Sequence, residues 1–314
     1  MQEENVITKI PKDGFLLSKQ HGYGFWSDMH DVWAKLLLAE ITNREPIIYW
    51  GKDSLYSVDE NHSSFEQYFL PVSDYSMDDV VNEKYTYFPF MWNPYNLFQT
   101  DPTRHLRVFQ NIDLLINSDA DVLVCDTYNF VHNFMPWIKE GHPAYGLDED
   151  AIYRYMHNKY IKLQPDIAAE IDEFYHTHMQ TGPILGVQAR GGSKLNEDPR
   201  WREVIELIPH EIDCYLKDNP TARIFLLTDD EPVLERFKQM YGDLLIYTDC
   251  TRKTIYDIEI CLNVFPDKRR KGIEIIKDTY LACKCDSFIG NQGSGVTHAI
   301  SRMKAWDKDK IKQL

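Results

Sequence analysis

The chain has 314 residues, 43% of them hydrophobic and 26% charged, and its formal net charge is −15. This composition predicts a folded protein long enough for two domains, and the acidic balance argues against a nucleic-acid-binding protein. No apolar stretch approaches the roughly 20 residues of a membrane helix, and residues 1–5 lack a secretory-signal pattern. We therefore expect a cytoplasmic protein without a transmembrane segment, with peripheral membrane association left open and the oligomeric state unknown.

The first half begins with a strand–helix–strand pattern. Apolar residues predict strands over 14–17 and 46–50, and a loop over 21–28 between them leads into a helix that ends near Thr42. Residues 121–126 predict a further strand of the same kind. A strand, a glycine-containing loop, a helix and a strand form a βαβ unit.

The second half repeats this alternation. Residues 151–178 are helical by pattern, and Gly182-Pro183 then breaks the chain, so we place a domain boundary between 180 and 181. Repeated βα units predict a parallel sheet covered by helices. The predicted class is α/β, with two Rossmann-like domains over 1–180 and 181–314 and a ligand-binding cleft between them. In the second domain we expect strands over 184–188, 222–227, 244–247 and 287–289, and helices over 201–217, 231–240, 272–283 and from about 294.

One strand end suits an anion. The apolar strand over 184–187 opens into a glycine-rich, cationic loop, in which backbone N–H groups and a guanidinium can converge on one phosphate. An ordinary flexible turn with solvated cations is the alternative. The polar residues of this loop are Gln188, Arg190, Ser193, Lys194, Glu197 and Asp198.

The next strand ends in carboxylates. Thr228 and the pair Asp229-Asp230 follow the strand over 222–227. One carboxylate of the pair is predicted to cap the following helix. The other is then available to meet a ribose or an incoming hydroxyl.

Two later segments carry further polar side chains. Asp278 lies near the buried face of the helix over 272–283, and a solvated carboxylate is its simplest interpretation. The strand over 287–289 breaks into three glycines around Ser294. Backbone amides there can approach an oxyanion, to which the serine hydroxyl adds a donor.

Together these four segments, in this order and spacing, resemble the sugar-nucleotide half of the α1,6-fucosyltransferases and the wider O-fucosyltransferase-like superfamily, which has the GT-B fold. In that family a strand ends in His-x-Arg, a Thr-Asp-Asp strand end follows, and a helical aspartate precedes a turn of small residues. The resemblance covers residues 182–303 and is fainter over 22–44.

The resemblance implies roles for the donor-binding residues. Arg190 matches the arginine that grips the donor diphosphate, Lys194 is the second cation, and Ser294 donates to the same group. Asp229 and Asp230 match an acidic pair near the nucleoside.

Asp278 matches the carboxylate that reads guanine. Guanine presents N1–H and N2–H side by side, and one carboxylate can accept both. Uracil has no such edge, so the resemblance implies a GDP-linked donor.

The chain departs from the family at three places. The motif histidine is Gln188, which can form hydrogen bonds but cannot carry a proton, and residues 191–193 replace the Arg-Thr-Asp that follows the motif arginine. The carboxylate suspected as the general base corresponds to Glu197 or Asp198, between which the alignment does not choose.

The resemblance implies an inverting, metal-independent glycosyltransferase that moves a hexosyl group, with fucose as the implied sugar, to a glycan hydroxyl. Arg190, with Lys194, would stabilise the departing diphosphate, and Asp198 or Glu197 would accept the hydroxyl proton. No cofactor is expected beyond the nucleotide-sugar substrate. A non-catalytic nucleotide- or sugar-binding protein is the alternative, for which Gln188 is the best evidence. The missing Walker loop disfavours a phosphotransferase.

The first loop supplies candidate acceptor-side residues. Tyr23 and Trp26 could stack on sugar rings, with core packing as the alternative for Trp26. Asp28 lies in the same stretch and is the next candidate for the general base.

Two other patterns are less informative. The six cysteines are most simply reduced thiols, and Cys283-Lys284-Cys285 is too tightly spaced for a zinc knuckle. We interpret the basic run over 268–271 as a solvated loop, with a phosphate-facing loop as the alternative.

Overall fold

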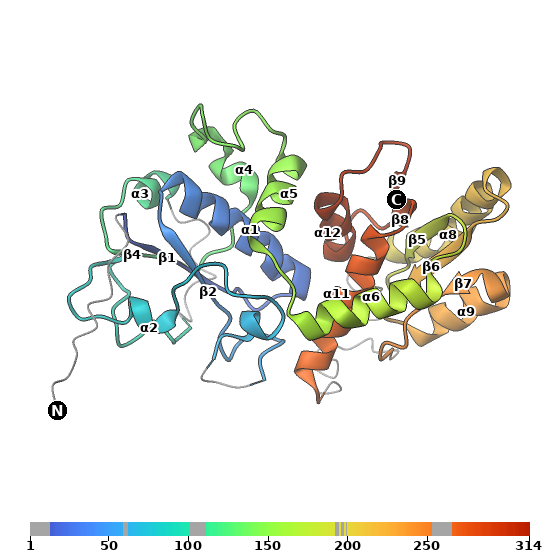
Figure 1. Cartoon of the computed structure of the whole chain (residues 1–314), viewed down its shortest axis with the longest axis horizontal. Coiled ribbons are helices and arrows are strands. Elements are labelled where there is room, and N and C mark those ends of the chain that lie inside the picture. Colours follow the sequence, from blue (N-terminus) through green and yellow to red (C-terminus); the bar gives the residue numbers. More distant parts are fainter. Residues whose placement is uncertain are drawn as a thin grey trace. The chain divides into compact units, whose positions relative to one another are not determined.

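The computed structural model describes residues 13–58, 62–100, 111–191, 195, 198, 200–252 and 266–314 (Figure 1). The chain forms two compact units, Met1–Lys162 (unit 1) and Leu163–Leu314 (unit 2). Each unit contains a parallel β-sheet with helices packed around it, so the predicted α/β class with two Rossmann-like domains is confirmed. Among the described residues, no helix combines the length and apolar character that crossing a membrane requires.

Unit 1 is built on a four-stranded sheet of order β2-β1-β4-β3. All its strand pairs are parallel, and Leu17 lies opposite Ile47 on one side and Val124 on the other. The central strands are buried along their whole length, as is typical of parallel sheets. The strands are β1 (Phe15–Lys19), β2 (Glu45–Tyr49), β3 (Tyr87–Phe88) and β4 (Val122–Cys125).

The central helix of unit 1 is α1 (Phe25–Ile41), which follows β1 and is buried on most of its surface. It packs against α4 and α5, and even Lys35 on this helix is fully buried. The other helices are α2 (Met77–Val80), α3 (Ile112–Ile116), α4 (Val131–Phe134) and α5 (Glu149–Tyr160), with 3₁₀ turns η1 (Ser64–Gln67) and η3 (Met135–Trp137).

Unit 2 contains a five-stranded parallel sheet of order β7-β6-β5-β8-β9. Val187 in the central strand lies opposite Leu226 and Ile289, and these side chains belong to one buried core. The strands are β5 (Ile184–Gln188), β6 (Arg223–Leu227), β7 (Leu245–Ile246), β8 (Ser287–Gly290) and β9 (Ile311–Gln313); the helices are α6 (Pro165–His178), α8 (Arg200–Asp218), α9 (Glu231–Tyr241), α11 (Lys268–Cys283) and α12 (Gly295–Met303), with a 3₁₀ turn η4 (Gly242–Leu244).

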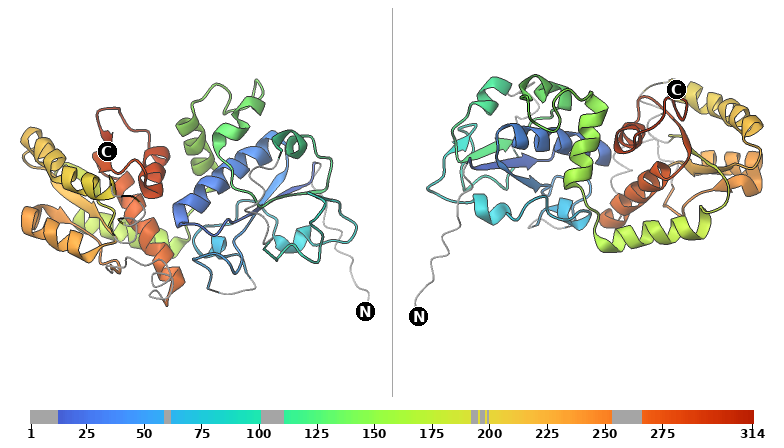
Figure 2. Two further views of the ribbon diagram at one scale, coloured as in Figure 1. Left: turned by 180° about the vertical axis from the view of Figure 1, so that it is seen from behind. Right: turned by 45° about the horizontal axis from the view of Figure 1, so that its top comes forward.

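Helix α6 belongs to unit 2, although the expected boundary between 180 and 181 assigned it to the first domain. It lies alongside α11 in both views of Figure 2. Ion pairs join the two helices, including Glu170 with Arg270 and Asp172 with Lys284. These partners are far apart in the sequence, which is why the helical pattern alone did not show where α6 packs.

Candidate functional site

The carboxyl ends of β5 and β8 form the topological switch point of the unit 2 sheet. From β5 the chain continues to β6 on one side, and from β8 it continues to β9 on the other. Parallel α/β sheets bind ligands outside the carboxyl ends of their strands, at this kind of position. The predicted site residues Arg190 and Ser294 follow these two strands.

Arg190 is held at the edge of the sheet by Asp229. Its Nε atom lies 3.1 Å from Oδ2 of Asp229, and the two side chains are 31% and 43% exposed. The other carboxylate oxygen of Asp229 accepts a hydrogen bond from the Gly191 N–H at 3.0 Å. Asp229 therefore joins the loop after β5 to the end of β6 and orients the guanidinium while leaving it accessible.

Gly191 is required because Asp230 packs directly against it. A Cβ atom at this position would lie 2.4 Å from Oδ2 of Asp230. Asp230 occupies the N-cap position of α9, but its side chain makes no capping hydrogen bond and is 2% exposed. Asp230 therefore takes the expected N-cap position, but neither carboxylate acts as predicted: Asp230 makes no capping bond and Asp229 is not free. The Asp230 side chain packs against Gly191, and Asp229 holds Arg190.

The side chain of Gln188 is buried in the interior of unit 2. Its Oε1 accepts a hydrogen bond from the Thr297 hydroxyl at 3.2 Å, and both side chains are buried. Gly290 permits this contact, because a Cβ atom there would lie 2.5 Å from Oγ1 of Thr297. Gln188 thus fixes α12 to the central strand.

Ser294 occupies the N-cap position of α12, and its side chain makes no capping hydrogen bond. The turn before it is held by Asn291, whose side-chain oxygen accepts a hydrogen bond from the Gly293 N–H at 2.7 Å. The Ser294 N–H donates to the Asn291 carbonyl at 3.0 Å. The turn presents a helix N-terminus at the sheet edge, which favours an anion.

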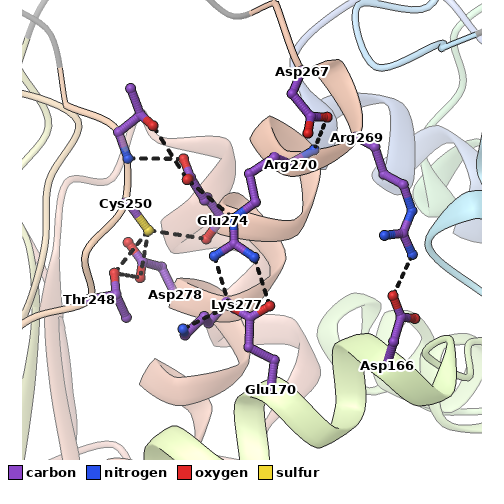
Figure 3. Close-up of polar contacts among 11 residues, drawn as sticks. Asp166, Glu170, Thr248, Cys250, Asp267, Arg269, Arg270, Glu274, Lys277 and Asp278 are labelled. Carbon is purple, nitrogen blue, oxygen red and sulfur yellow. Dashed lines mark hydrogen bonds and ion pairs between the residues drawn. The ribbon is translucent and has the colours of Figure 1, made fainter.

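Asp278 is hydrogen bonded rather than solvated, contrary to its simplest interpretation. The Thr248 hydroxyl donates to its Oδ1 at 2.6 Å, and the Cys250 thiol lies 3.6 Å from the same oxygen (Figure 3). Burial raises the pKa of Asp278 to about 6, against the hydrogen bond from Thr248 and the charge of Arg252. Thr248 and Cys250 follow β7, so a strand-end search extended to that strand would have found them.

The basic run over 268–271 is neither a solvated loop nor a phosphate-facing loop, because it forms the first turn of α11. Arg270 makes two hydrogen bonds to Glu170 of α6, each 2.7 Å, and Arg269 pairs with Asp166 at 2.7 Å (Figure 3). Lys277 also donates to Glu170 at 2.9 Å. These contacts, led by those from Arg270, lower the pKa of Glu170 to about 2.

The same network reaches the residues beside Asp278. The Thr251 N–H donates to Oε2 of Glu274 at 3.1 Å, and Nε of Arg270 lies 3.4 Å from Oε1 of Glu274. A chain of charges therefore runs from α6 through α11 to the segment after β7, close to Thr248 and Cys250.

The candidate bases differ in how they are held. Asp198 accepts hydrogen bonds from the backbone and side chain of Arg200, which lower its pKa. Glu197 and Lys194 lie outside the described residues. An aspartate with a lowered pKa is a weaker proton acceptor.

The acceptor-side candidates in unit 1 separate into one exposed and two buried residues. Tyr23 is 49% exposed, whereas Trp26 is 2% exposed and stacks on Trp33 in the core. Core packing, the alternative for Trp26, therefore accounts for this residue. Asp28 is 1% exposed, and its Oδ1 accepts a hydrogen bond from the Tyr23 N–H at 3.2 Å. Burial raises the pKa of Asp28 to about 7.

The described part of the chain brings no three histidine, cysteine, aspartate or glutamate side chains into a group that could hold a metal ion. The cysteines in this part of the chain are free thiols: Cys125, Cys214, Cys250, Cys283 and Cys285.

No known protein-family profile matches the chain, and no curated protein sequence matches it either. Its structure is similar to that of NodZ α-1,6-fucosyltransferase soaked with GDP-fucose, with a TM-score of 0.65 and 18% identity over 95% of this chain and 97% of that one. It is also similar to a mutant of Arabidopsis thaliana FUT1 in complex with GDP (TM-score 0.59, 12% identity, 92% and 68% coverage). A third similar structure is POFUT1 in complex with GDP-fucose (TM-score 0.56, 11% identity, 96% and 97% coverage). The chain therefore has the GT-B fold of two Rossmann-like domains that these fucosyltransferases share.

Proposed function

We propose that the protein is a glycosyltransferase that transfers a hexosyl group from a GDP-linked donor to a glycan hydroxyl, with fucose as the sugar. The observation that carries this proposal is the pairing of two groups at the carboxyl edge of one sheet. A cation, Arg190, follows β5, and a half-buried carboxylate, Asp278, is bonded to Thr248 after β7. A nucleoside diphosphate needs both: a donor to its phosphates and an acceptor for its base. The fold shared with fucosyltransferases solved with GDP or GDP-fucose supports the same assignment.

In the proposed reaction the acceptor oxygen forms a bond to the anomeric carbon as the bond from that carbon to the diphosphate oxygen breaks. The configuration at the anomeric carbon inverts, and GDP leaves with the bonding electrons. Arg190, the amides and hydroxyl at Ser294, and Lys194 would stabilise the developing charge. These cations would take the role of a divalent metal ion, so the transfer is proposed to need none.

The acceptor proton passes to a carboxylate. Glu197 or Asp198 is assigned by resemblance, although the pairing of Asp198 with Arg200 weakens it as a base. Asp28 is the next candidate; burial raises its pKa to about 7, but its carboxylate is 1% exposed and accepts a hydrogen bond from the Tyr23 N–H.

A second candidate function is a non-catalytic nucleotide-sugar-binding protein. Gln188 favours it, because the amide in the place of the family's histidine is buried and bonded to Thr297. Tight binding of GDP-fucose without release of GDP, in the presence of oligosaccharide acceptors, would support this candidate.

Thermal-shift measurements with GDP, UDP, CDP and ADP test the proposed donor, since a nucleotide bound to the native state raises the melting temperature. We expect the largest shift with GDP. Asp278→Asn should reduce the preference for GDP, because an amide replaces one acceptor by a donor. Asp172→Asn, which changes an exposed carboxylate on α6 of the same unit, is the matched control. Affinity for UDP about tenfold above that for GDP, or roughly 1.4 kcal/mol, would contradict the assignment.

Release of GDP from GDP-fucose in the presence of oligosaccharides tests the transfer itself. Excess EDTA should leave the rate unchanged. A rate that vanishes with EDTA and returns with manganese would show that the cations of the site do not suffice.

A further inference from the structure

A row of five aromatic rings lies at the carboxyl edge of the unit 1 sheet. We call these residues the aromatic strip: His21 and Tyr23 in the loop after β1, and Tyr128, Phe130 and His132 in the segment after β4. Neighbouring ring centroids are 4.6 Å apart for His21 and Tyr23, 5.8 Å for Tyr23 and Tyr128, and 5.0 Å for Tyr128 and Phe130. The rings of Phe130 and His132 stack at 5.1 Å with an interplanar angle of 11°.

The strip leaves ring surface exposed to solvent. Tyr23 and Phe130 are 49% and 39% exposed, and the side chain of His132 is 53% exposed. Burying an aromatic ring stabilises a folded protein, so a contiguous group of large rings left at the surface is typical of a binding site.

Hydrogen bonds to α1 hold the strip in place. The Tyr128 hydroxyl donates to the Ser27 carbonyl at 3.0 Å, and the Tyr23 N–H donates to the buried carboxylate of Asp28. The Asn129 N–H donates to Oδ1 of Asp31 at 2.9 Å. All three acceptors belong to α1, so one buried helix fixes both segments of the strip. A surface ordered in advance binds a ligand at a smaller entropic cost.

The position of the strip also indicates a ligand site. β1 and β4 are neighbours in a parallel sheet, and the segments that leave their carboxyl ends carry all five rings. The carboxyl edge is where open α/β sheets bind their ligands.

The chemistry of the rings selects a carbohydrate. Pyranose rings have faces of C–H groups that stack on aromatic faces, and hydroxyls around their rims. Tyr23 offers both a ring face and a phenol hydroxyl at its edge, and Phe130 and His132 add exposed ring faces. The carboxylate of Glu149 lies 3.3 Å from Nδ1 of His132 at one end of the strip, so an anionic ligand is not favoured.

We propose that the aromatic strip binds the pyranose rings of a neutral oligosaccharide. The sugar-binding role is independent of donor chemistry. Its assignment as the acceptor subsite rests on the proposed function.

Saturation-transfer NMR of the full chain tests the strip, with four neutral tetrasaccharides as probes: β-1,4-linked glucose, β-1,4-linked N-acetylglucosamine, α-1,4-linked glucose and α-1,6-linked mannose. At least one should bind without any nucleotide. Phe130→Leu keeps an apolar side chain but removes the ring, and Tyr23→Ala removes a second ring. Each should weaken binding about three- to tenfold, the range that one aromatic contact supplies.

Tyr95→Ala is the matched control. Tyr95 is 75% exposed and bonds to Glu83, which precedes β3 in the sequence, so it lies outside the strip. This variant should bind the sugar as the unaltered chain does. Unchanged melting temperature and GDP affinity in the strip variants would establish that they are folded.

Absence of binding by all four probes, or binding that Phe130→Leu and Tyr23→Ala leave unchanged, would overturn the proposal. GDP binding separates this failure from failure of the proposed function. A chain that binds GDP and transfers sugar but has an inert strip refutes the inference alone. A chain that binds oligosaccharide through the strip but binds no nucleotide refutes the proposed function alone.

Discussion

The carboxyl edges of the two sheets use charged residues in opposite ways. At the unit 1 edge the charged side chains are buried. Lys35 is fully buried and pairs with Asp31 at 2.5 Å. Lys19 is 4% exposed, and its ammonium lies 4.1 Å from the ring centroid of Trp92. At the unit 2 edge Arg190 and its partner remain about a third to two-fifths exposed. Charged side chains lie near the carboxyl ends of parallel strands in both units, and burial decides whether they hold the architecture or are available to a ligand.

This difference separates two kinds of ligand. The unit 1 edge covers its charges and presents rings, which suits an uncharged polyhydroxy compound. The unit 2 edge presents a guanidinium beside a helix N-terminus, which suits a phosphate.

The strongest test of the comparison is to remove an internal charge from unit 1. Asp31→Asn leaves Lys35 buried without this counter-charge, and breaking a buried pair costs about 3–5 kcal/mol of unfolding free energy. Relief of the buried Asp31 carboxylate, whose pKa burial raises to about 6, offsets part of this loss. Urea-induced unfolding measures this loss. A change well below about 1 kcal/mol would show that the pair behaves like a surface ion pair.

Asp28→Asn, three residues earlier on the same helix, should change the unfolding free energy in the opposite direction. Burial raises the pKa of Asp28 to about 7, so the protonated form is favoured by folding. The stability that it contributes is full below pH 4 and is lost as the pH rises through 7. Asparagine imitates the protonated form. The variant should be more stable at pH 8, by at most roughly 4 kcal/mol, and equal to the unaltered chain near pH 4. Destabilisation at pH 8 would contradict the assigned pKa.

The next effect tests the exposed cation of unit 2. Arg190→Ala should lower the transfer rate about 10²–10³-fold and weaken GDP binding by roughly 1.5–3 kcal/mol, while guanosine binding stays unchanged. Arg236→Ala is the matched control, since Arg236 is an exposed arginine bonded to Glu206 in the same unit. Calorimetry that finds the GDP affinity of folded Arg190→Ala unchanged would remove Arg190 from the phosphate site.

The smallest effect concerns the ion pairs between α6 and α11. Arg270→Met should lower the unfolding free energy by about 1 kcal/mol, because Arg270 connects Glu170 with Glu274. Arg269→Met removes one exposed ion pair and should lower it by less than about 0.5 kcal/mol. The pKa of Glu170 is about 2, so this stabilisation is present above pH 4.5 and is lost only as the pH falls towards 2. The Arg270→Met effect should therefore be equal at pH 5 and pH 8. Equal effects of the two substitutions would argue against a connected network.

Local patterns predicted most of the fold. Apolar runs bounded by glycine and proline gave the positions of β5, β6 and β8. The contact between Arg190 and Asp229 at the ends of β5 and β6 was not part of the prediction. Two short edge strands were not expected. β3 has two residues, and β9, Ile311–Gln313, is largely exposed, so neither shows the buried apolar run on which the prediction depends.

Long-range contacts explain why the sequence did not predict several interactions at the site. Gln188 meets Thr297, and Arg270 meets Glu170, across more than 90 residues of chain. Neither residue type indicates such a partner in advance. The same holds for Asp278, whose bond to Thr248 depends on how α11 packs against the sheet beside β6.

The assignment of α6 to unit 2 determines where the chain can be divided for separate expression. A fragment that starts at residue 163 keeps Asp166, Glu170 and Asp172, the acidic partners of α11. A fragment that starts at 181, where the helical pattern alone would place the cut, removes all three. It would expose a cationic helix flank able to bind nucleic acid or other polyanions nonspecifically, a property that the intact chain neutralises with its own helix.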